Sequence, residues 1–283
     1  MKLAIIGANG QLGTDLQGVL SKEHDVVGLN HADIEITDID NVKNVLLSIK
    51  PEFVLNTAAY NLVPQAEQYP DKAFHVNGTG TLNLAKVCQD LGIRLVHYST
   101  DYVFDGKKQK PYTEDDCPNP LNVYGNTKLS GEYFTLIYSD KSYVIRVSGI
   151  YGKVPSRSKG GNFITTMIKL AKEKPEVRVV DDEILTPTPT YHIAKNTAEL
   201  IKTDAFGLYH MSCEGECSWY EFARVIWETL QLETPLYPVS IKDFPLVVKR
   251  PVYSVLENKN LNKLRINKMP EWKEVLVDFL KKV

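Results

Sequence analysis

The chain alternates short, wholly apolar runs with longer segments in which apolar residues recur every three or four positions. Short runs rich in β-branched residues predict strands that are buried on both faces, and the longer segments predict helices. The strands are expected over residues 2–6, 25–29, 53–56, 94–99 and 143–147, and the helices over 14–20, 39–49, 70–91 and from 122 onward. This alternation predicts an α/β fold with a parallel, doubly wound sheet.

The pattern loosens beyond residue 149. A basic loop, Arg157 to Gly161, precedes the next helix, and Pro187 and Pro189 argue against any regular element over 181–190. Helices are expected over 162–172, 191–202, 219–230 and 271–283, and strands over 177–180 and 207–211. We therefore predict a Rossmann-like domain over 1–150 and a smaller, partly interleaved α/β substrate domain over 151–283, with the 191–202 helix packing back onto the first domain.

Composition narrows the classes of function. The 283 residues are 43% hydrophobic and 24% charged, and the net charge is -2, without a basic segment suited to nucleic acid. No apolar run approaches the roughly 20 residues that span a bilayer. The N-terminus lacks a cleavable signal pattern, and the four cysteines are scattered as in a reducing cytoplasm. These features predict a cytoplasmic protein that binds neither membranes nor nucleic acid, and no metal site is predicted.

A glycine-rich turn follows the first strand directly, in Gly7-Ala8-Asn9-Gly10-Gln11-Leu12-Gly13. Glycines at this spacing serve a tight turn, close approach to a phosphate and close helix–strand packing, and the following helix offers free N–H groups to a pyrophosphate. The turn therefore predicts a dinucleotide site. Asn30 and His31 end the second strand, where an acid favours NAD and an arginine NADP, so the choice of cofactor stays open.

Tyr124 and Lys128 lie four residues apart in a predicted helix and so share one of its faces. A lysine ammonium close to a phenol stabilises the phenolate and lowers the pKa of the tyrosine. Such a pair can exchange a proton with a carbonyl or an alcohol near neutral pH. Thr100 directly follows the fourth predicted strand, at the carboxyl end where open α/β sheets bind ligands.

Together these segments resemble the extended short-chain dehydrogenase/reductase superfamily, and within it the dTDP-4-dehydrorhamnose reductase family. The resemblance is carried by the glycine turn, by Ser99-Thr100-Asp101-Tyr102-Val103-Phe104-Asp105-Gly106, by Asn122-Val123-Tyr124-Gly125-Asn126-Thr127-Lys128, and by Gly161-Asn162-Phe163 and Arg250-Pro251-x-Tyr253-Ser254. It implies reduction of a 4-keto-6-deoxy sugar nucleotide with NADPH or NADH, most simply dTDP-4-dehydrorhamnose to dTDP-rhamnose, for cell-surface polysaccharide. It also allows a homodimer.

The resemblance implies a role for each matched residue. Tyr124 would donate the proton, Lys128 would lower the pKa of Tyr124 and bind the nicotinamide ribose, and Thr100 would orient the carbonyl. The implied cofactor contacts are Gly7, Gly10, Gln11, Leu12, Gly13, Glu35, Ile36, Ala58, Ala59, Tyr60, Tyr124 and Lys128. The implied sugar contacts are Asp101, Tyr102, Val103 and Phe104.

Several positions depart from the family pattern near the implied sugar site. Gly149 stands where the family commonly has a tryptophan, so one wall of the pocket is missing or is supplied elsewhere. Pro64 replaces an aspartate of a segment that is linked to a metal-bridged dimer in some members, Leu185 replaces a glycine, and Glu183 adds a negative charge. The exact sugar is therefore left open.

Two other functions are compatible with the same fold. Nucleotide-sugar epimerases and dehydratases share the fold, but they commonly carry an Asp–Glu pair where this chain has Asp101-Tyr102. The regulatory beta subunit of methionine adenosyltransferase resembles the same family and binds nucleotide without catalysis. The intact set of Thr100, Tyr124 and Lys128 disfavours such a pure binding role.

Overall fold

A six-stranded parallel sheet forms the centre of the computed structural model, which describes residues 1–155, 160–243 and 248–282. Its strands are β1 (Lys2–Ile6), β2 (Asp25–Leu29), β3 (Phe53–Asn56), β4 (Arg94–Thr100), β5 (Ser142–Val147) and β10 (Gly207–His210). They lie in the order β10-β5-β4-β3-β1-β2, and every pair is parallel. This order confirms the predicted doubly wound sheet. Arg157 and Lys159 of the predicted basic loop, and Val283, lie outside the described residues.

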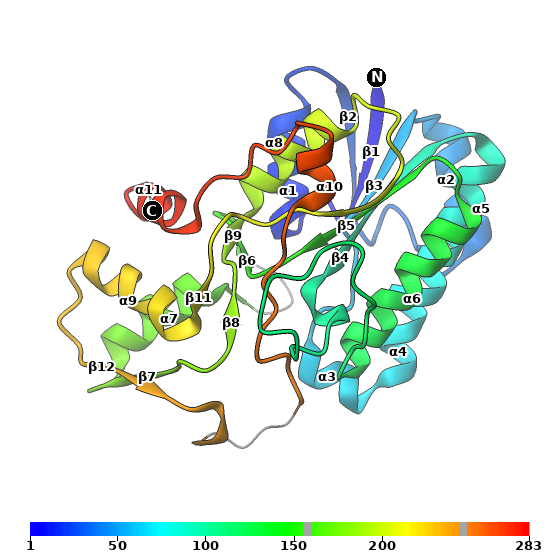
Figure 1. The fold of residues 1–283 in the computed structure, drawn as a ribbon. Coiled ribbons are helices and arrows are strands. Elements are labelled where there is room, and N and C mark those ends of the chain that lie inside the picture. Colours follow the sequence, from blue (N-terminus) through cyan, green and yellow to red (C-terminus); the bar gives the residue numbers. More distant parts are fainter. Residues whose placement is uncertain (156–159, 244–247, 283) are drawn as a thin grey trace.

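Helices cover both faces of the sheet (Figure 1). On one face lie α2 (Ile39–Ile49), α5 (Thr81–Leu91) and α6 (Val123–Tyr138); on the other lie α1 (Gln11–Leu20) and α8 (Thr190–Leu200). Successive strand residues point to opposite faces, so Leu3 and Ile5 pack with α1 while Ala4 and Ile6 pack with α2 and α5. Burial on both faces explains why these strands read as unbroken apolar runs. No helix among the described residues has both the length and the apolarity needed to cross a membrane.

The order of the strands indicates where a ligand can bind. The chain goes from β1 outward to β2 and then returns to the other side of β1 for β3. At such a reversal the connections leave the carboxyl ends of the strands in opposite directions, and ligands bind in the gap between them. The turns after β1 and β3 border this gap.

The helix predicted over 70–91 exists but is not regular. It consists of α4 (Pro70–Phe74), a π-helical turn (His75–Gly80) and α5. Within the turn, the Asn77 side chain binds both the N–H and the C=O of Tyr60, at 2.8 and 3.1 Å. π-Helical turns inside α-helices occur frequently at functional sites. Here the turn ties the helix to the segment that follows β3.

The second half of the chain builds a smaller group of elements and also returns to the sheet (Figure 1). The group contains α7 (Phe163–Glu173), α9 (Trp219–Leu230), α11 (Trp272–Leu280), and the pairs β7 (Val177–Val180) with β12 (Leu236–Val239), β6 (Ile150–Tyr151) with β9 (Thr188–Pro189) and β8 (Ile184–Leu185) with β11 (Cys217–Ser218). The remaining described helices are α3 (Val63–Gln68) and α10 (Lys259–Lys263), besides short 3₁₀ turns. The expectation of no regular element over 181–190 is wrong, because β8, β9 and the start of α8 lie there. Each of the two strands is only two residues long, and Pro189 is tolerated because it is the last residue of β9.

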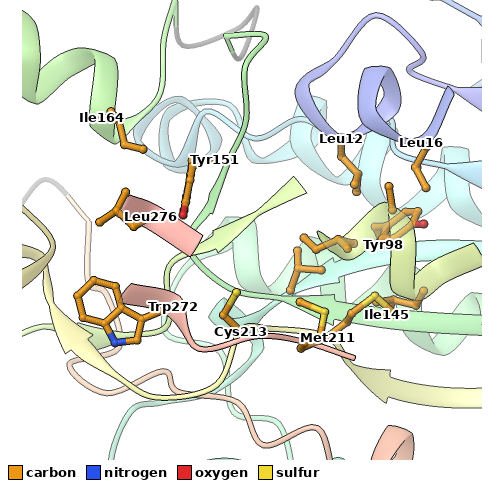
Figure 2. Close-up of a cluster of buried hydrophobic side chains, with 14 of the residues drawn as sticks. Leu12, Leu16, Tyr98, Ile145, Tyr151, Ile164, Met211, Cys213, Trp272 and Leu276 are labelled. Carbon is orange, nitrogen blue, oxygen red and sulfur yellow. The ribbon is translucent and has the colours of Figure 1, made fainter. Parts of the chain in front are cut away.

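The two halves share one hydrophobic core. The helix α8 packs on α1, and β10 forms the edge of the main sheet beside β5. Figure 2 shows the cluster running from Leu12 and Ile145, through Met211, to Trp272 of α11. A continuous packed interior therefore joins the two halves.

Candidate active site

A cavity of about 870 Å³ opens at the carboxyl ends of β1, β3 and β4. We call the lining residues before position 149 its sheet side, and those from Gly149 onward its C-terminal side. The sheet side includes Gly7, Gly10, Gln11, Leu12, Ala58, Ala59, Thr100, Asp101, Tyr102, Tyr124 and Lys128. The C-terminal side includes Gly149, Asn162, Arg178, Glu183, Leu185, Trp219 and Arg250. Most of the predicted site residues thus meet in one cavity.

The glycine turn fits a dinucleotide pyrophosphate. Gly10 precedes α1, no side chain caps this helix end, and its first turn carries no acid, so its N–H groups are available to an anion. Gly13 has a packing role instead, since a Cβ there would lie 2.3 Å from the Gly7 carbonyl oxygen. The turn therefore allows both close helix packing and close approach of a ligand, as the spacing predicts.

The predicted residues that do not line the cavity fall into three groups. Val103 and Phe104 are fully buried in a cluster with Tyr112, Leu129 and Leu256, so the structure places them beneath the cavity wall. Ile36 packs in the core beside α2, while Glu35 accepts hydrogen bonds from Thr37. Gly13 packs against the turn, and Tyr60 is held by Asn77.

Thr100 connects the end of β4 to both neighbouring site residues. Its hydroxyl donates to Asp101 Oδ1 at 3.1 Å and accepts from the Tyr102 N–H at 3.2 Å. Asp101 also accepts from Ser148 and Ser254 at 3.0 and 2.6 Å, so its carboxylate joins the sheet to the C-terminal segment. Burial raises the pKa of Asp101, and these hydroxyl donors oppose the shift. Asp101 therefore orients the Thr100 hydroxyl, and both of its carboxylate oxygens already accept hydrogen bonds.

Tyr124 is the second residue of α6, whose first turn is fixed by the Asn122 side chain accepting from the Gly125 N–H. Burial raises the pKa of Tyr124 to about 12, and a hydrogen bond with Thr100 opposes that shift. The ring packs edge-on against Tyr102. This direction is opposite to the predicted lowering by Lys128, because spacing alone does not reveal how strongly burial disfavours a phenolate.

Lys128 lies on the same face of α6 and is 2% exposed. Its Nζ donates to the Tyr98 carbonyl oxygen at 2.6 Å and lies 3.4 Å from His97 Nε2. Burial lowers the pKa of Lys128 to about 8, while the Glu132 carboxylate opposes the shift. Sequence reasoning missed His97, although a histidine within the apolar run Arg94-Leu95-Val96-His97 was a readable signal.

Two departures from the family pattern face each other on the C-terminal side. Gly149 has φ +53°, and a Cβ built there would lie 2.8 Å from Leu185 Cδ1 and 2.9 Å from the Thr186 carbonyl oxygen. Leu185 is buried and lines the cavity. Leu185 therefore occupies the space that a side chain at 149 would need, and it supplies the wall that Gly149 lacks.

Charged and aromatic side chains complete the C-terminal side. Burial raises the pKa of Glu183, while the positive charge of Arg250 and a hydrogen bond with Trp219 oppose the shift. Sequence reasoning did not assign Trp219, Arg178 or Asn162 to the site. Asn162 caps α7 and donates to the Gly152 carbonyl oxygen at 3.0 Å; its place in Gly161-Asn162-Phe163 was the available signal.

Comparisons with known proteins agree with this geometry. The family model described as "RmlD substrate binding domain" matches residues 1–283. The spore coat polysaccharide biosynthesis protein SpsK of Bacillus subtilis (strain 168) is 38% identical over 280 residues, which cover 99% of this chain and 96% of that protein. A dTDP-4-keto-6-deoxy-D-glucose reductase of Streptomyces niveus is 35% identical over 275 residues, covering 96% of this chain and 94% of that one.

A solved structure is similar throughout. The dTDP-4-dehydrorhamnose reductase of Bacillus anthracis str. Ames, determined in complex with NADP, has a TM-score of 0.95 and 38% identity, covering 100% of this chain and 99% of that chain. The resemblance drawn from the motifs is thereby confirmed. The chain belongs to the RmlD substrate binding domain family, that of the dTDP-4-dehydrorhamnose reductases.

Proposed function

We propose that this protein is an NAD(P)H-dependent reductase of a 4-keto-6-deoxy sugar nucleotide, converting dTDP-4-dehydrorhamnose to dTDP-rhamnose for cell-surface polysaccharide. The observation that carries the proposal is the meeting of Thr100, Tyr124 and Lys128 in one cavity that also exposes the glycine turn. A protein that only bound nucleotide would have no chemical need for this acid–base set.

The bound reduced nicotinamide supplies the hydride, and the chain supplies the proton. With its pKa raised to about 12, Tyr124 stays protonated at neutral pH and can act as the acid. The hydrogen bond between Tyr124 and Thr100 opposes the raised pKa of Tyr124, so it favours the phenolate that proton transfer leaves behind. A substrate carbonyl that enters beside these two groups accepts the Tyr124 proton as negative charge develops on its oxygen.

The residues on the sheet side position the cofactor in this proposal. Gly7, Gly10, Gln11 and Leu12 hold the pyrophosphate, and Ala58 and Ala59 leave room beside the nicotinamide. Lys128 lines the cavity next to Tyr124 and is the group available to the nicotinamide ribose. Asp101 and Tyr102 border the sugar, while Glu35, Ile36 and Tyr60 stay predictions for the cofactor. Cytoplasmic location and a homodimer also stay predictions.

The identity of the sugar depends on the C-terminal side of the cavity. The Streptomyces niveus relative is named for a different keto sugar, dTDP-4-keto-6-deoxy-D-glucose. An epimerase would need a further free acid or base at the sugar, and Asp101 does not serve because three hydroxyl groups already donate to it. This occupancy favours the reductase over the epimerase.

The test is a panel of dTDP- and UDP-linked 4-keto-6-deoxy sugars, each supplied with NADPH or NADH while the nicotinamide absorbance is followed. We expect steady oxidation with dTDP-4-dehydrorhamnose. Tyr124→Phe should lower kcat by about 100-fold or more, the usual contribution of a positioned general acid, with cofactor affinity unchanged. Cofactor binding without turnover of any keto sugar would favour the binding protein instead.

A further inference from the structure

Three groups, the Ala58 N–H, Asn56 and His97, form a chain of hydrogen bonds that ends at Lys128, and the donor and acceptor of each bond can be assigned. Asn56 and His97 are opposite each other in the pairing of β3 with β4, so their side chains leave the same face of the sheet. Asn56 is 1% exposed and His97 is fully buried. The proposed reaction gives neither of them a role.

The direction is set by a backbone donor. The Ala58 N–H donates to Asn56 Oδ1 at 3.1 Å, which identifies the other atom of the amide as Nδ2. Nδ2 can only donate, and it lies 3.2 Å from His97 Nδ1. His97 Nδ1 must therefore be the acceptor, so the proton of the neutral ring is on Nε2.

His97 Nε2 faces Lys128 Nζ at 3.4 Å, and this contact holds only if Nζ offers a lone pair. A neutral amine satisfies every partner, because it accepts from His97, donates to the Tyr98 carbonyl oxygen and keeps one N–H for the cavity. An ammonium would instead point an N–H at an N–H. Burial and the nearby lysine hold the pKa of His97 well below its usual range, which excludes the doubly protonated ring.

We propose that His97 is a positioning residue, oriented by Asn56, whose Nε2–H donates to the neutral amine of Lys128, so that it favours loss of the lysine proton and fixes Nζ beside the Tyr98 carbonyl oxygen. Because Ala58 begins the chain and lines the cavity, the sheet-side loop and the lysine are connected through the protein interior. The inference deepens the proposed function and rests on it only for the role given to Lys128.

The other groups near Lys128 do not reverse this assignment. Tyr124, on the same helix, stays protonated because burial raises its pKa. Glu132, one turn further along α6, favours the ammonium, but its carboxylate is shared with Arg146 of β5 at 2.7 Å and with Ser99. The pKa of Lys128 is lowered to about 8, so the ammonium prevails at neutral pH and the neutral amine becomes the main form as pH rises above 8.

Nuclear magnetic resonance on the protein alone tests the chain without relying on catalysis. In protein labelled with ¹⁵N-histidine, one of the six histidines should be a neutral Nε2–H tautomer that does not titrate near neutral pH, and His97→Gln should remove its signal. In protein labelled with ¹³C-lysine, one resonance should titrate near pH 8 and be absent in Lys128→Met. An Nδ1–H tautomer for His97 would overturn the proposal.

Matched substitutions test the coupling. His97→Asn removes the donor at the Nε2 position and should move the Lys128 titration upward by roughly one pH unit, whereas the longer amide of His97→Gln can replace that donor and should move it less. Asn56→Asp keeps an oxygen that accepts from the Ala58 N–H but has no N–H to donate. His97 must then carry its proton on Nδ1, so Nε2 no longer donates to Lys128 and the pH at which Lys128 titrates should rise. An unchanged Lys128 titration in folded His97→Asn and Asn56→Asp proteins would contradict the proposal, whether or not the enzyme reduces sugars.

The same variants separate positioning from a merely structural role in catalysis. The pH at which kcat falls on the basic side of its profile should move with the Lys128 titration. It should rise in His97→Asn and rise less in His97→Gln. A fall in kcat of equal size at every pH would assign His97 a structural role only. Absence of keto-sugar reduction by the wild type would count against the proposed function, and the titrations would still decide the inference.

Discussion

The two sides of the cavity are built in different ways. The sheet side meets a ligand largely through backbone, with the glycine turn and Ala58 and Ala59 at strand ends, and it adds the side chains of Thr100, Tyr124 and Lys128. The C-terminal side presents bulky or charged side chains, notably Leu185, Glu183 and Arg250, from short strands and connecting segments. The sheet side thus defines the chemistry, while the C-terminal side determines which sugar can enter. Substitutions on the two sides should therefore change different measured constants.

The largest effect is expected from Gly13→Ala on the sheet side. Its Cβ would lie 2.3 Å from the Gly7 carbonyl oxygen and 2.8 Å from Ala8 Cα, so the glycine turn must shift. We expect NADPH and NADH to bind at least about tenfold more weakly, a loss of roughly 1.4 kcal/mol, as measured by calorimetry.

The matched control lies in the same helix. Gly18 is exposed, and a Cβ there meets nothing within 4 Å, so Gly18→Ala should raise stability by up to about 1 kcal/mol and leave cofactor affinity unchanged. If the two variants bound cofactor equally well, the glycine turn would not be the cofactor site.

A smaller effect, confined to the substrate, is expected from Leu185→Ala. Removing this side chain opens the wall opposite Gly149, and the preference between keto sugars should change by about tenfold, the usual range for a few methylene groups in a pocket. Leu185→Met conserves volume and should change it little. Relative kcat/KM values for two sugar nucleotides measure the change. A loss of cofactor affinity in Leu185→Ala would contradict the division into two sides.

The smallest effect concerns Glu183. Its carboxylate offsets the charge of Arg250, so Glu183→Gln should lower the KM of the anionic sugar nucleotide about threefold near neutral pH. The pKa of Glu183 is raised, so the wild-type carboxyl takes up its proton above the usual range as pH falls. The KM values of wild type and variant should then converge at acidic pH. A constant ratio across pH would show that charge is not the cause.

Sequence reasoning predicted the sheet well because burial on both faces leaves unbroken apolar runs, as in Leu3 to Ile6. It also found Tyr124 and Lys128, whose spacing is local. It could not find the contact of Gly149 with Leu185, because short strands distant in sequence bring these residues together. The direction of the Tyr124 pKa was predicted wrongly for a related reason: burial depends on the packed fold, not on the spacing of one helix.

The central claim is that the sheet side delivers a hydride and a proton to one carbonyl. It is tested most directly with NADPH deuterated at the transferable position and dTDP-4-dehydrorhamnose, by mass spectrometry and nuclear magnetic resonance of the product. The account predicts one deuterium, bound to C4 of the sugar, and about 100-fold less of this labelled product from Tyr124→Phe over the same time. Product without deuterium, or solvent hydrogen exchanged into C3 or C5, would contradict it and indicate an epimerase.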